Sequence, residues 1–291
     1  MKPAPFSYHA PTTLGEALDM LERLDNSRII AGGQSLVPML NFRVANPDHL
    51  IDLRLIPGLS GIQEVGKILR IGAMTRQRIV EFSPLVRSLC PLLGEAIQHV
   101  GHQQTRNWGT VGGSLCHLDP AAELPVVALA LDVTLTIANR AGTRQLPFMD
   151  FPVGHLTSQL GQAEILTQID FPTMGTNGLW GFEEFARRPG DIAILTSAVR
   201  LDVDSNGQVL NARIAIGGIG PIPVRIIEAE SALVGNRPSP PVVDLVGEIC
   251  ASQPTEGDDV YPAEYRQHLA KTLVKRALTK AARRRPGASH D

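Results

Sequence analysis

Residues 106–120 read Arg-Asn-Trp-Gly-Thr-Val-Gly-Gly-Ser-Leu-Cys-His-Leu-Asp-Pro, and this segment carries the strongest functional signal in the chain. A smaller version lies upstream at residues 29–36, which read Ile-Ile-Ala-Gly-Gly-Gln-Ser-Leu. Both place a Gly-Gly pair beside small hydroxyl residues. Paired glycines let backbone N–H groups approach an anion without a Cβ in the way, and they reach the dihedral angles of an anion-binding nest. Two such loops in one domain indicate a ligand with two phosphates and a long body, which we interpret as FAD.

The surroundings of the first motif favour phosphate binding. Residues 28–31 are predicted to form a strand that runs into Gly32 and Gly33, and Ser35 is expected to cap a helix over the residues that follow. A strand that leads through a glycine turn into a helix N-terminus is a favourable place for a phosphate group. The second motif is predicted to be a loop, followed by an apolar helix over residues 124–131 and a strand over residues 133–137.

Two other phosphate-binding signatures are absent or incomplete in this sequence. The GxGxxG signature of a Rossmann unit does not occur, so a dinucleotide would bind outside that plan. Residues 61–67 match GxxxxGK, the start of a P-loop, but Ile68 stands where a Ser or Thr hydroxyl is needed for Mg²⁺. A β-like run follows instead of a helix. We therefore interpret this segment as a hairpin turn with an exposed Lys67.

Composition narrows the class of protein. The apolar fraction of 43% and the charged fraction of 19% over 291 residues are typical of a globular chain with a buried core. A net charge of −2 and an aromatic content of 4% argue against a nucleic-acid partner. No run approaches the roughly 18 apolar residues of a membrane span, so we expect no membrane span and a cytoplasmic location. Three dispersed cysteines are too few to ligate an iron–sulfur cluster, and we predict no metal site.

The pattern of strands and helices indicates an α+β protein of two domains. The turn-rich segment 171–178 marks the boundary, with a first domain over residues 1–175, whose two lobes divide near residues 55–60, and a second over residues 176–291. The second domain is predicted to contain three strands followed by helices. The strands cover residues 179–185, 193–203 and 209–216, and the helices cover residues 226–234, 242–250 and 263–283. The basic C-terminus is interpreted as a solvated helix face, with contact to an acidic partner as the alternative.

Three motifs in this order resemble one known family. They are residues 31–36, residues 109–120, and residues 185–193, which read Phe-Ala-Arg-Arg-Pro-Gly-Asp-Ile-Ala. Together they look like the FAD-binding medium subunit of molybdenum hydroxylases, the group that contains carbon monoxide dehydrogenase and xanthine dehydrogenase. The similarity runs over roughly residues 3–285. It implies a two-lobed FAD-binding domain of the vanillyl-alcohol-oxidase (PCMH) type, followed by a small α+β C-terminal domain with a three-stranded sheet.

The resemblance also implies roles for individual residues. The first motif would hold the pyrophosphate with Ala31, Gly32, Gly33, Gln34 and Ser35, and the second with Thr110, Val111, Gly112, Gly113 and Ser114. The remaining cofactor contacts would be Cys116, His117, Glu123, Leu166, Asp191 and Ile192. Glu183 lines up with a basic flavin contact of the xanthine-oxidising branch, so NAD is only one candidate acceptor.

The function implied by the resemblance is electron transfer. A large partner subunit with a molybdenum cofactor would hydroxylate the substrate, and a small subunit with two [2Fe–2S] clusters would pass electrons to FAD on this chain and then to an external acceptor. We nominate no catalytic acid, base or nucleophile. The alternatives are a free-standing FAD-dependent oxidoreductase with its own substrate, and a scaffold that has lost FAD. Copurification with two metal-bearing partners would favour the electron-transfer subunit over a free-standing oxidoreductase. The absorption spectrum of a bound flavin would exclude a scaffold that has lost FAD.

Overall fold

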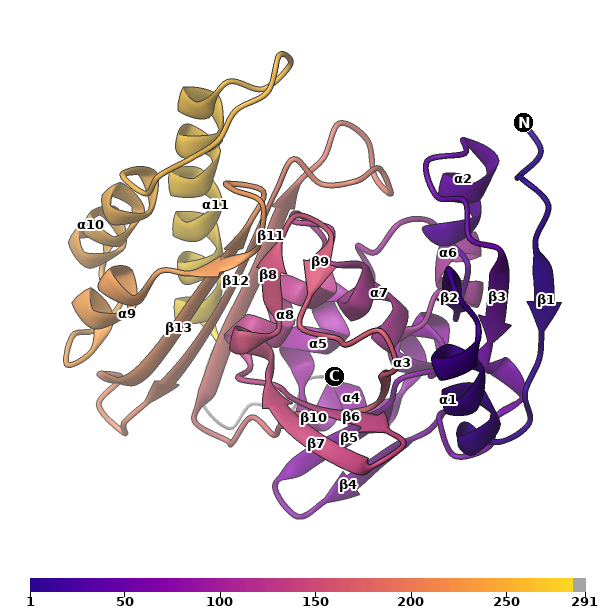
Figure 1. Ribbon diagram of the computed structural model, residues 1–291. Coiled ribbons are helices and arrows are strands. Elements are labelled where there is room, and N and C mark those ends of the chain that lie inside the picture. Colours follow the sequence, from indigo (N-terminus) through magenta and orange to yellow (C-terminus); the bar gives the residue numbers. More distant parts are fainter. Residues whose placement is uncertain (285–291) are drawn as a thin grey trace.

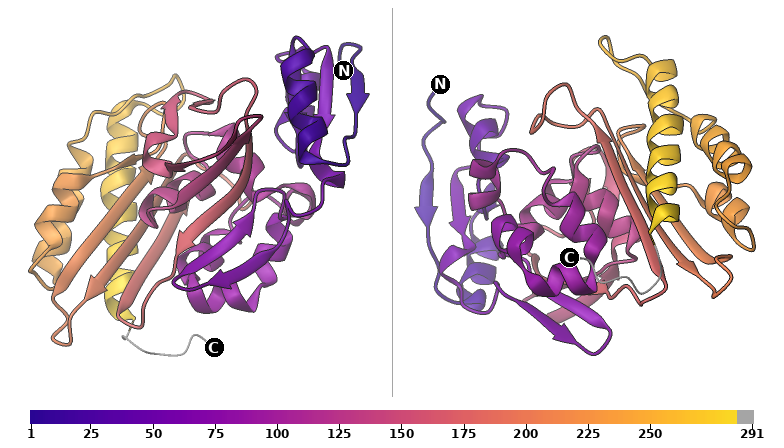
Figure 2. Two further views of the ribbon diagram at one scale, coloured as in Figure 1. Left: turned by 60° about the horizontal axis from the view of Figure 1, so that its bottom comes forward. Right: turned by 180° about the vertical axis from the view of Figure 1, so that it is seen from behind.

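The computed structural model describes residues 1–284 as an N-terminal lobe, a central lobe and a C-terminal domain (Figure 1). The N-terminal lobe and the C-terminal domain lie at opposite ends of the molecule in both views of Figure 2. Arg285 and the residues after it, which belong to the predicted second domain and basic C-terminus, lie outside the described residues. Among residues 1–284, no helix is both long and apolar enough to cross a membrane.

The N-terminal lobe is a small parallel sheet with strand order β1-β3-β2. Its strands are β1 (Ser7–His9), β2 (Ser27–Ile30) and β3 (His49–Asp52). Helices α1 (Leu14–Arg23) and α2 (Leu36–Asn41) form the crossovers that parallel strands require. Thr13 begins α1 with a capping box, because its hydroxyl accepts from the Glu16 N–H and the Glu16 carboxylate accepts from the Thr13 N–H. The 3₁₀ helix η1 (Leu53–Leu55) then leads into the central lobe.

The central lobe is built on an antiparallel sheet with strand order β4-β5-β10-β6-β7. Its strands are β4 (Ile62–Val65), β5 (Ile68–Gly72), β6 (Thr134–Asn139), β7 (Gly142–Pro147) and β10 (Ile165–Pro172). The P-loop-like segment forms the β4–β5 hairpin, with Gly66 at a φ of 61° and Lys67 exposed in the turn. The predicted hairpin is therefore confirmed.

Helices and short elements complete the central lobe. They are α3 (Gln77–Phe82), α4 (Pro84–Leu89), α5 (Pro91–Ala96), α6 (Gln103–Trp108), α7 (Val111–His117), α8 (Glu123–Ala130), η2 (Phe148–Asp150), β8 (Pro152–Gly154) and β9 (Thr157–Ser158). Helix α4 ends before Pro91, which cannot continue it and instead begins α5. The second glycine motif, residues 106–120, was expected to be a loop, but most of it belongs to the end of α6 and to α7.

The C-terminal domain contains the three expected strands, β11 (Gly178–Phe185), β12 (Leu195–Val203) and β13 (Val209–Gly217), in one antiparallel sheet. The two-residue strand β14 (Val224–Arg225) adds a short fourth strand at the edge of β13. The turn over residues 204–207 joins β12 to β13, as its Asp-Ser-Asn-Gly sequence predicts. Helices α9 (Ile227–Leu233), α10 (Pro240–Ala251) and α11 (Ala263–Arg283) follow.

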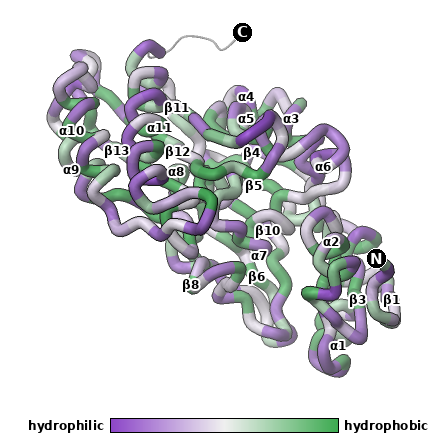
Figure 3. Tube along the Cα trace, turned by 90° about the horizontal axis from the view of Figure 1, so that it is seen from above, coloured by the Kyte–Doolittle hydropathy of each residue, from purple (hydrophilic) through white to green (hydrophobic). Residues whose placement is uncertain are grey.

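Both faces of this sheet are covered. Alternate residues such as Trp180 and Phe182 on β11 point to the central lobe and join its hydrophobic core, while Leu179 joins the core under α10 and α11. Helix α11 lies so close to β11 that a Cβ at Gly181 would overlap the Ala277 carbonyl. One face of α11 packs on the sheet, and hydrophobic and hydrophilic segments therefore alternate along this helix in Figure 3. One face of the C-terminal sheet therefore shares the core of the central lobe, and the other face has a separate core under the helices.

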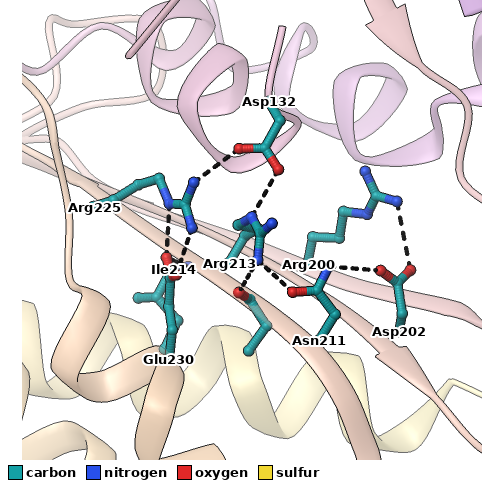
Figure 4. A network of polar contacts seen from close by, with 9 residues as sticks. Asp132, Arg200, Asp202, Asn211, Arg213, Ile214, Arg225 and Glu230 are labelled. Atoms are coloured by element: carbon teal, nitrogen blue, oxygen red, sulfur yellow. Dashed lines mark hydrogen bonds and ion pairs between the residues drawn. The ribbon is translucent and has the colours of Figure 1, made fainter. Parts of the chain in front are cut away.

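A polar network reinforces this junction (Figure 4). Asp132, which follows α8 in the central lobe, accepts from Arg213 Nε at 2.7 Å and from Arg225 Nη1 at 2.8 Å. Arg225 also pairs with the buried Glu230 on α9, and the Glu230 carboxylate accepts from the Ile214 N–H at 3.0 Å. The network holds β13, β14 and α9 against the end of α8.

Candidate functional site

The first glycine motif is an irregular loop, residues 31–35, between β2 and α2. Gly33 has a φ of 71°, in the left-handed region that favours glycine. Gly32 approaches the second motif so closely that a Cβ there would overlap the Trp108 carbonyl and lie 2.7 Å from the Gly109 Cα. Each glycine is therefore required for a different reason, one for the turn and the other for the close approach of two backbone segments.

Four consecutive N–H groups of this loop are unpaired with protein. The amides of Gly32, Gly33, Gln34 and Ser35 donate to no acceptor in the described part of the chain. The Gln34 side chain instead donates to the Gly32 carbonyl at 3.2 Å, within the loop. Successive free N–H groups form a natural binding site for an oxyanion, and a diphosphate fits such a site.

Ser35 does not cap α2 as expected. The residue occupies the N-cap position with helical dihedral angles, φ −100° and ψ −47°, and its side chain accepts no capping hydrogen bond. An N-cap side chain normally reaches back from an extended backbone conformation. The Ser35 hydroxyl is therefore not used by α2.

The second glycine motif is a helix and not the expected loop. Thr110 caps α7 by accepting from the Gly113 N–H at 3.0 Å, and its carbonyl accepts from the Ser114 N–H at 3.2 Å. The Val111 N–H donates to the Thr75 carbonyl at 3.0 Å, and the Gly112 N–H donates to the Ala73 carbonyl at 2.9 Å. All four amides at this helix terminus are thus satisfied by protein acceptors. A Cβ at Gly112 would lie 2.6 Å from that of Ala73, so this glycine serves close packing.

The two motifs nevertheless lie side by side, although about 80 residues separate them in the sequence. Gly32 contacts the backbone at Trp108 and Gly109, and a Cβ built on Gly113 would lie 3.6 Å from the Ala31 Cβ. The convergence expected from the sequence is therefore present, with one motif offering free amides and the other forming the wall behind them.

A pocket of about 420 Å³ opens over the first motif. It is lined by Ile30, Ala31, Gly32, Gly33, Gln34, Val37, Pro38, Asp52, Arg54, Arg76 and Trp108. Five of these, Val37, Pro38, Asp52, Arg54 and Arg76, lie outside both glycine motifs and were not predicted, and Trp108 lies in the second motif but was given no role. A signal existed for Asp52 and Arg54, because they end β3 beside β2, and the carboxyl ends of neighbouring parallel strands meet at one edge. No sequence pattern predicted Arg76, because it lies at the pocket through an antiparallel β-bridge with Thr110, which is distant in the sequence.

The charged groups of the pocket leave a positive excess. Asp52 accepts from the Tyr8 hydroxyl at 2.6 Å and from the Arg54 backbone N–H at 2.9 Å, and it pairs with the Arg54 guanidinium at 3.3 Å. The hydrogen bond to Asp52 raises the pKa of Tyr8. Arg76 lies over the Trp108 ring at 5.3 Å, and burial lowers its pKa. Two guanidinium groups against one carboxylate give this wall a charge of +1.

The remaining predicted contacts do not line this pocket. Cys116 and His117 lie in the last turn of α7, where burial raises the pKa of the cysteine to about 12 and lowers that of the histidine. Glu123 begins α8, and Leu166 lies on β10 with 4% exposure. Asp191 and Ile192 lie in the exposed loop between β11 and β12, and Ile192 is 75% exposed.

The loop between β11 and β12 contacts the central lobe. Gly190 has a φ of 85° and lies directly against the ring of His102, the residue that precedes α6. This contact places the loop that carries Asp191 and Ile192 at the edge of the central lobe. It does not bring either side chain to the pocket.

Glu183 and Glu184 point to opposite faces of the C-terminal sheet. Its carboxylate pairs with Lys280 on α11 at 3.2 Å, so it lies on the face of the sheet away from the central lobe. The adjacent Glu184 faces the central lobe and pairs with His99 Nδ1 at 3.2 Å. Successive strand residues point to opposite faces. Of the two carboxylates, only that of Glu184 therefore faces the central lobe. Within residues 1–284, no cluster of three or more His, Cys, Asp or Glu side chains could hold a metal ion.

Comparison with known proteins gives a consistent result over the whole chain. Residues 4–174 match the model of the FAD binding domain in molybdopterin dehydrogenase, and residues 180–281 match the CO dehydrogenase flavoprotein C-terminal domain. The chain is 38% identical over 290 residues to the 6-hydroxypseudooxynicotine dehydrogenase complex subunit alpha of Paenarthrobacter nicotinovorans, covering 98% of this chain and 97% of the relative. It is 34% identical to the carbon monoxide dehydrogenase medium chain of Hydrogenophaga pseudoflava, with coverage of 97% and 98%.

A solved structure supports the same assignment. Carbon monoxide dehydrogenase from Hydrogenophaga pseudoflava, in a form that lacks the Mo-pyranopterin moiety of its molybdenum cofactor, matches with a TM-score of 0.94 and 35% identity. The match covers 97% of this chain and 98% of that chain. This chain therefore belongs to the family of FAD-binding medium subunits of molybdenum hydroxylases, as its glycine motifs indicated.

Proposed function

We propose that this chain holds FAD between its N-terminal and central lobes and serves as the electron-passing subunit of a heterotrimeric molybdenum hydroxylase. The observation that carries the proposal is the row of four free amides in residues 32–35, the first three of which belong to residues that line a positively charged pocket. Bound FAD supplies the capacity to accept and release electrons, and the protein supplies position, electrostatics and access.

The two motifs have complementary roles in this proposal. The loop over residues 31–35 binds the diphosphate through its amides, and Thr110 to Ser114 hold that loop in place at the start of α7. Helix α7 then extends for seven residues, or about 10 Å, from the diphosphate toward Cys116 and His117. This length suits the ribityl chain. The flavin end is assigned to Glu123 and Leu166 in the first domain, residues 1–175, and to Asp191 and Ile192 in the second domain, residues 176–291, so both domains contribute to the proposed cofactor site.

The partners follow from the relatives. The Paenarthrobacter relative is named as a subunit of a dehydrogenase complex, and the Hydrogenophaga relative as the medium chain of an enzyme with a molybdenum cofactor. We assign to this chain a large partner with the molybdenum cofactor, a small partner with two [2Fe–2S] clusters, and an external electron acceptor. We place the complex in the cytoplasm, where the free thiols of Cys90, Cys116 and Cys250 remain reduced.

Purification of the chain from its native source tests this function. The expected product is a yellow complex that contains two metal-bearing partner chains and one FAD per copy of this chain. The FAD is released by denaturation of the complex and identified by its absorption spectrum. A colourless chain would contradict cofactor binding. A yellow chain that purifies alone and reduces its flavin with a substrate of its own would indicate the free-standing oxidoreductase instead.

A further inference from the structure

Arg76 is a basic residue of the pocket that the glycine motifs did not predict. It is partly buried at the start of α3, next to the free amides of the loop over residues 31–35. We propose that Arg76 binds the diphosphate of the cofactor and makes the site selective for ligands that carry a diphosphate. The inference rests on the proposed function, because it assumes that FAD occupies this pocket.

The charge of Arg76 is not balanced by protein. Arg54 in the same pocket pairs with Asp52, and Arg78, two residues along the chain, pairs with Glu81 at 3.0 Å. Arg76 forms no ion pair with any residue between 1 and 284. A guanidinium that is partly removed from water without a counter-ion is unfavourable, and an anionic ligand would relieve this.

The side chain is held in place while most of its donors remain free. Its guanidinium lies over the Trp108 ring, and Nη1 donates to the Trp108 carbonyl. A guanidinium has five N–H donors in a planar fork, so two anchoring contacts leave donors directed elsewhere. The same Trp108 carbonyl borders Gly32, so Arg76 is positioned by the segment that also supports the amide loop.

The loop and the arginine together match the chemistry of a diphosphate. Four consecutive amides provide neutral donors along one side, and the wall formed by Arg54, Asp52 and Arg76 carries a net charge of +1. Arginine binds phosphate oxygens in a bidentate manner and more strongly than neutral donors do. A diphosphate presents oxygens to both groups at once, and a ligand without phosphate presents none.

Binding measurements on the full chain, after removal of its flavin, test the proposal. The variants are Arg76→Gln, Arg76→Lys and the control Arg78→Gln, which lies on the same helix but outside the pocket. FAD is titrated by quenching of flavin fluorescence, and ADP is titrated as a competitor at two salt concentrations. We expect Arg76→Gln to weaken both FAD and ADP by about 10- to 100-fold, with a smaller salt dependence, since charged hydrogen bonds are lost.

The controls separate this inference from the proposed function. Arg76→Lys should recover part of the affinity, and Arg78→Gln should bind FAD as the wild type does, with thermal unfolding confirming that each variant is folded. Unchanged FAD affinity in Arg76→Gln overturns the inference. So does a loss for FAD without a loss for ADP, which would place Arg76 away from the diphosphate. If the wild-type chain itself binds no FAD, the proposed function fails instead.

Discussion

At the scale of single residues, Glu123, which we propose for the flavin end, has a strongly raised pKa. Its side chain is 6% exposed, and burial raises its pKa from 4.5 to about 7. The nearby carboxylates of Glu184 and Asp119 add to the shift, and His99 opposes it. A carboxyl group in such surroundings is favoured as the neutral acid. Glu123 is therefore able to donate a hydrogen bond near neutral pH, which an ordinary glutamate does not do.

The raised pKa of Glu123 predicts a pH-dependent stability. The unfolded carboxyl ionises near pH 4.5 and the folded one near 7, so its contribution is complete below pH 4.5 and is lost as pH rises through about 7. The whole effect amounts to about 3 kcal/mol in the free energy of unfolding. We expect Glu123→Gln to flatten this dependence and to be more stable than the wild type at pH 8. Urea unfolding of the flavin-free chain at pH 6 and pH 8 measures it.

The exposed Glu228 on α9 provides the matched control for this test. Glu228→Gln removes the same charge without changing a buried group, so it should leave the pH dependence of unfolding unaltered. Equal slopes for Glu123→Gln and the wild type would show that Glu123 does not titrate in this window.

At the scale of elements, two similar Gly-Gly motifs have different structures. Residues 31–35 stay irregular, because Gly33 adopts a left-handed conformation and the backbone must pass over Trp108. Residues 111–117 become helical, because Thr110 provides a cap and the carbonyls of Ala73 and Thr75 accept from the first amides. The difference depends on the residues around each Gly-Gly pair and on the conformation that they impose on its glycines. It decides which motif can offer N–H groups to a ligand.

Removal of the Thr110 hydroxyl and removal of the Ser35 hydroxyl should therefore have unequal effects on the free energy of unfolding. Thr110→Ala deletes the N-cap of α7 and should lower the free energy of unfolding by about 1 kcal/mol. Ser35→Ala removes no capping bond and should change it by less than about 0.5 kcal/mol. Both are measured by urea unfolding of the flavin-free chain, so that cofactor binding does not contribute. Equal losses would mean that Ser35 caps α2 in solution.

At the scale of the whole molecule, the C-terminal domain is part of the structure that supports the cofactor domain. Trp180 and Phe182 complete the core of the central lobe. The Trp180 indole also donates to Glu95 on α5 at 3.0 Å, and Arg284 pairs with the same carboxylate at 2.6 Å. With a shared core and polar links of this kind, we expect the two parts to unfold in one transition.

The junction in Figure 4 provides a test of this coupling. Asp132→Asn keeps a residue that tolerates the left-handed φ of 51° at this position, but it removes the charge facing Arg213 and Arg225. Since Arg225 is only 9% exposed, we expect a loss of about 1–2 kcal/mol in a single transition followed by circular dichroism. Two separate transitions in the wild type would contradict the shared core.

Asp19→Asn is the control for that experiment. Asp19 pairs with Arg140 at 3.0 Å, but both side chains are about half exposed, at 43% and 51%. Exposed ion pairs contribute little, so the loss should stay below about 0.5 kcal/mol. A comparable loss in both variants would show that the network at Asp132 has no special structural role.

Much of the fold could be predicted because its signals are local. The capping box at Thr13, the hairpin turns at Gly66 and Gly207, and the strands of the C-terminal sheet all follow from short sequence patterns. The local sequence pattern did not predict α6 and α7. Its glycines argue against a helix, but carbonyl groups from a distant segment accept from the first amides of α7 and stabilise it. It also missed Arg76, whose place in the pocket depends on a bridge between distant segments.

By itself, the sequence determined the order of the elements, the family and the two motifs that meet at the cofactor site, because turns, caps and hydrophobic periodicity act over a few residues. Only the tertiary structure decided which motif keeps its amides free, which arginine remains without a carboxylate, and which of Glu183 and Glu184 faces the central lobe. These outcomes depend on hydrogen-bond partners and packing contacts from remote parts of the chain. No local pattern contains that information.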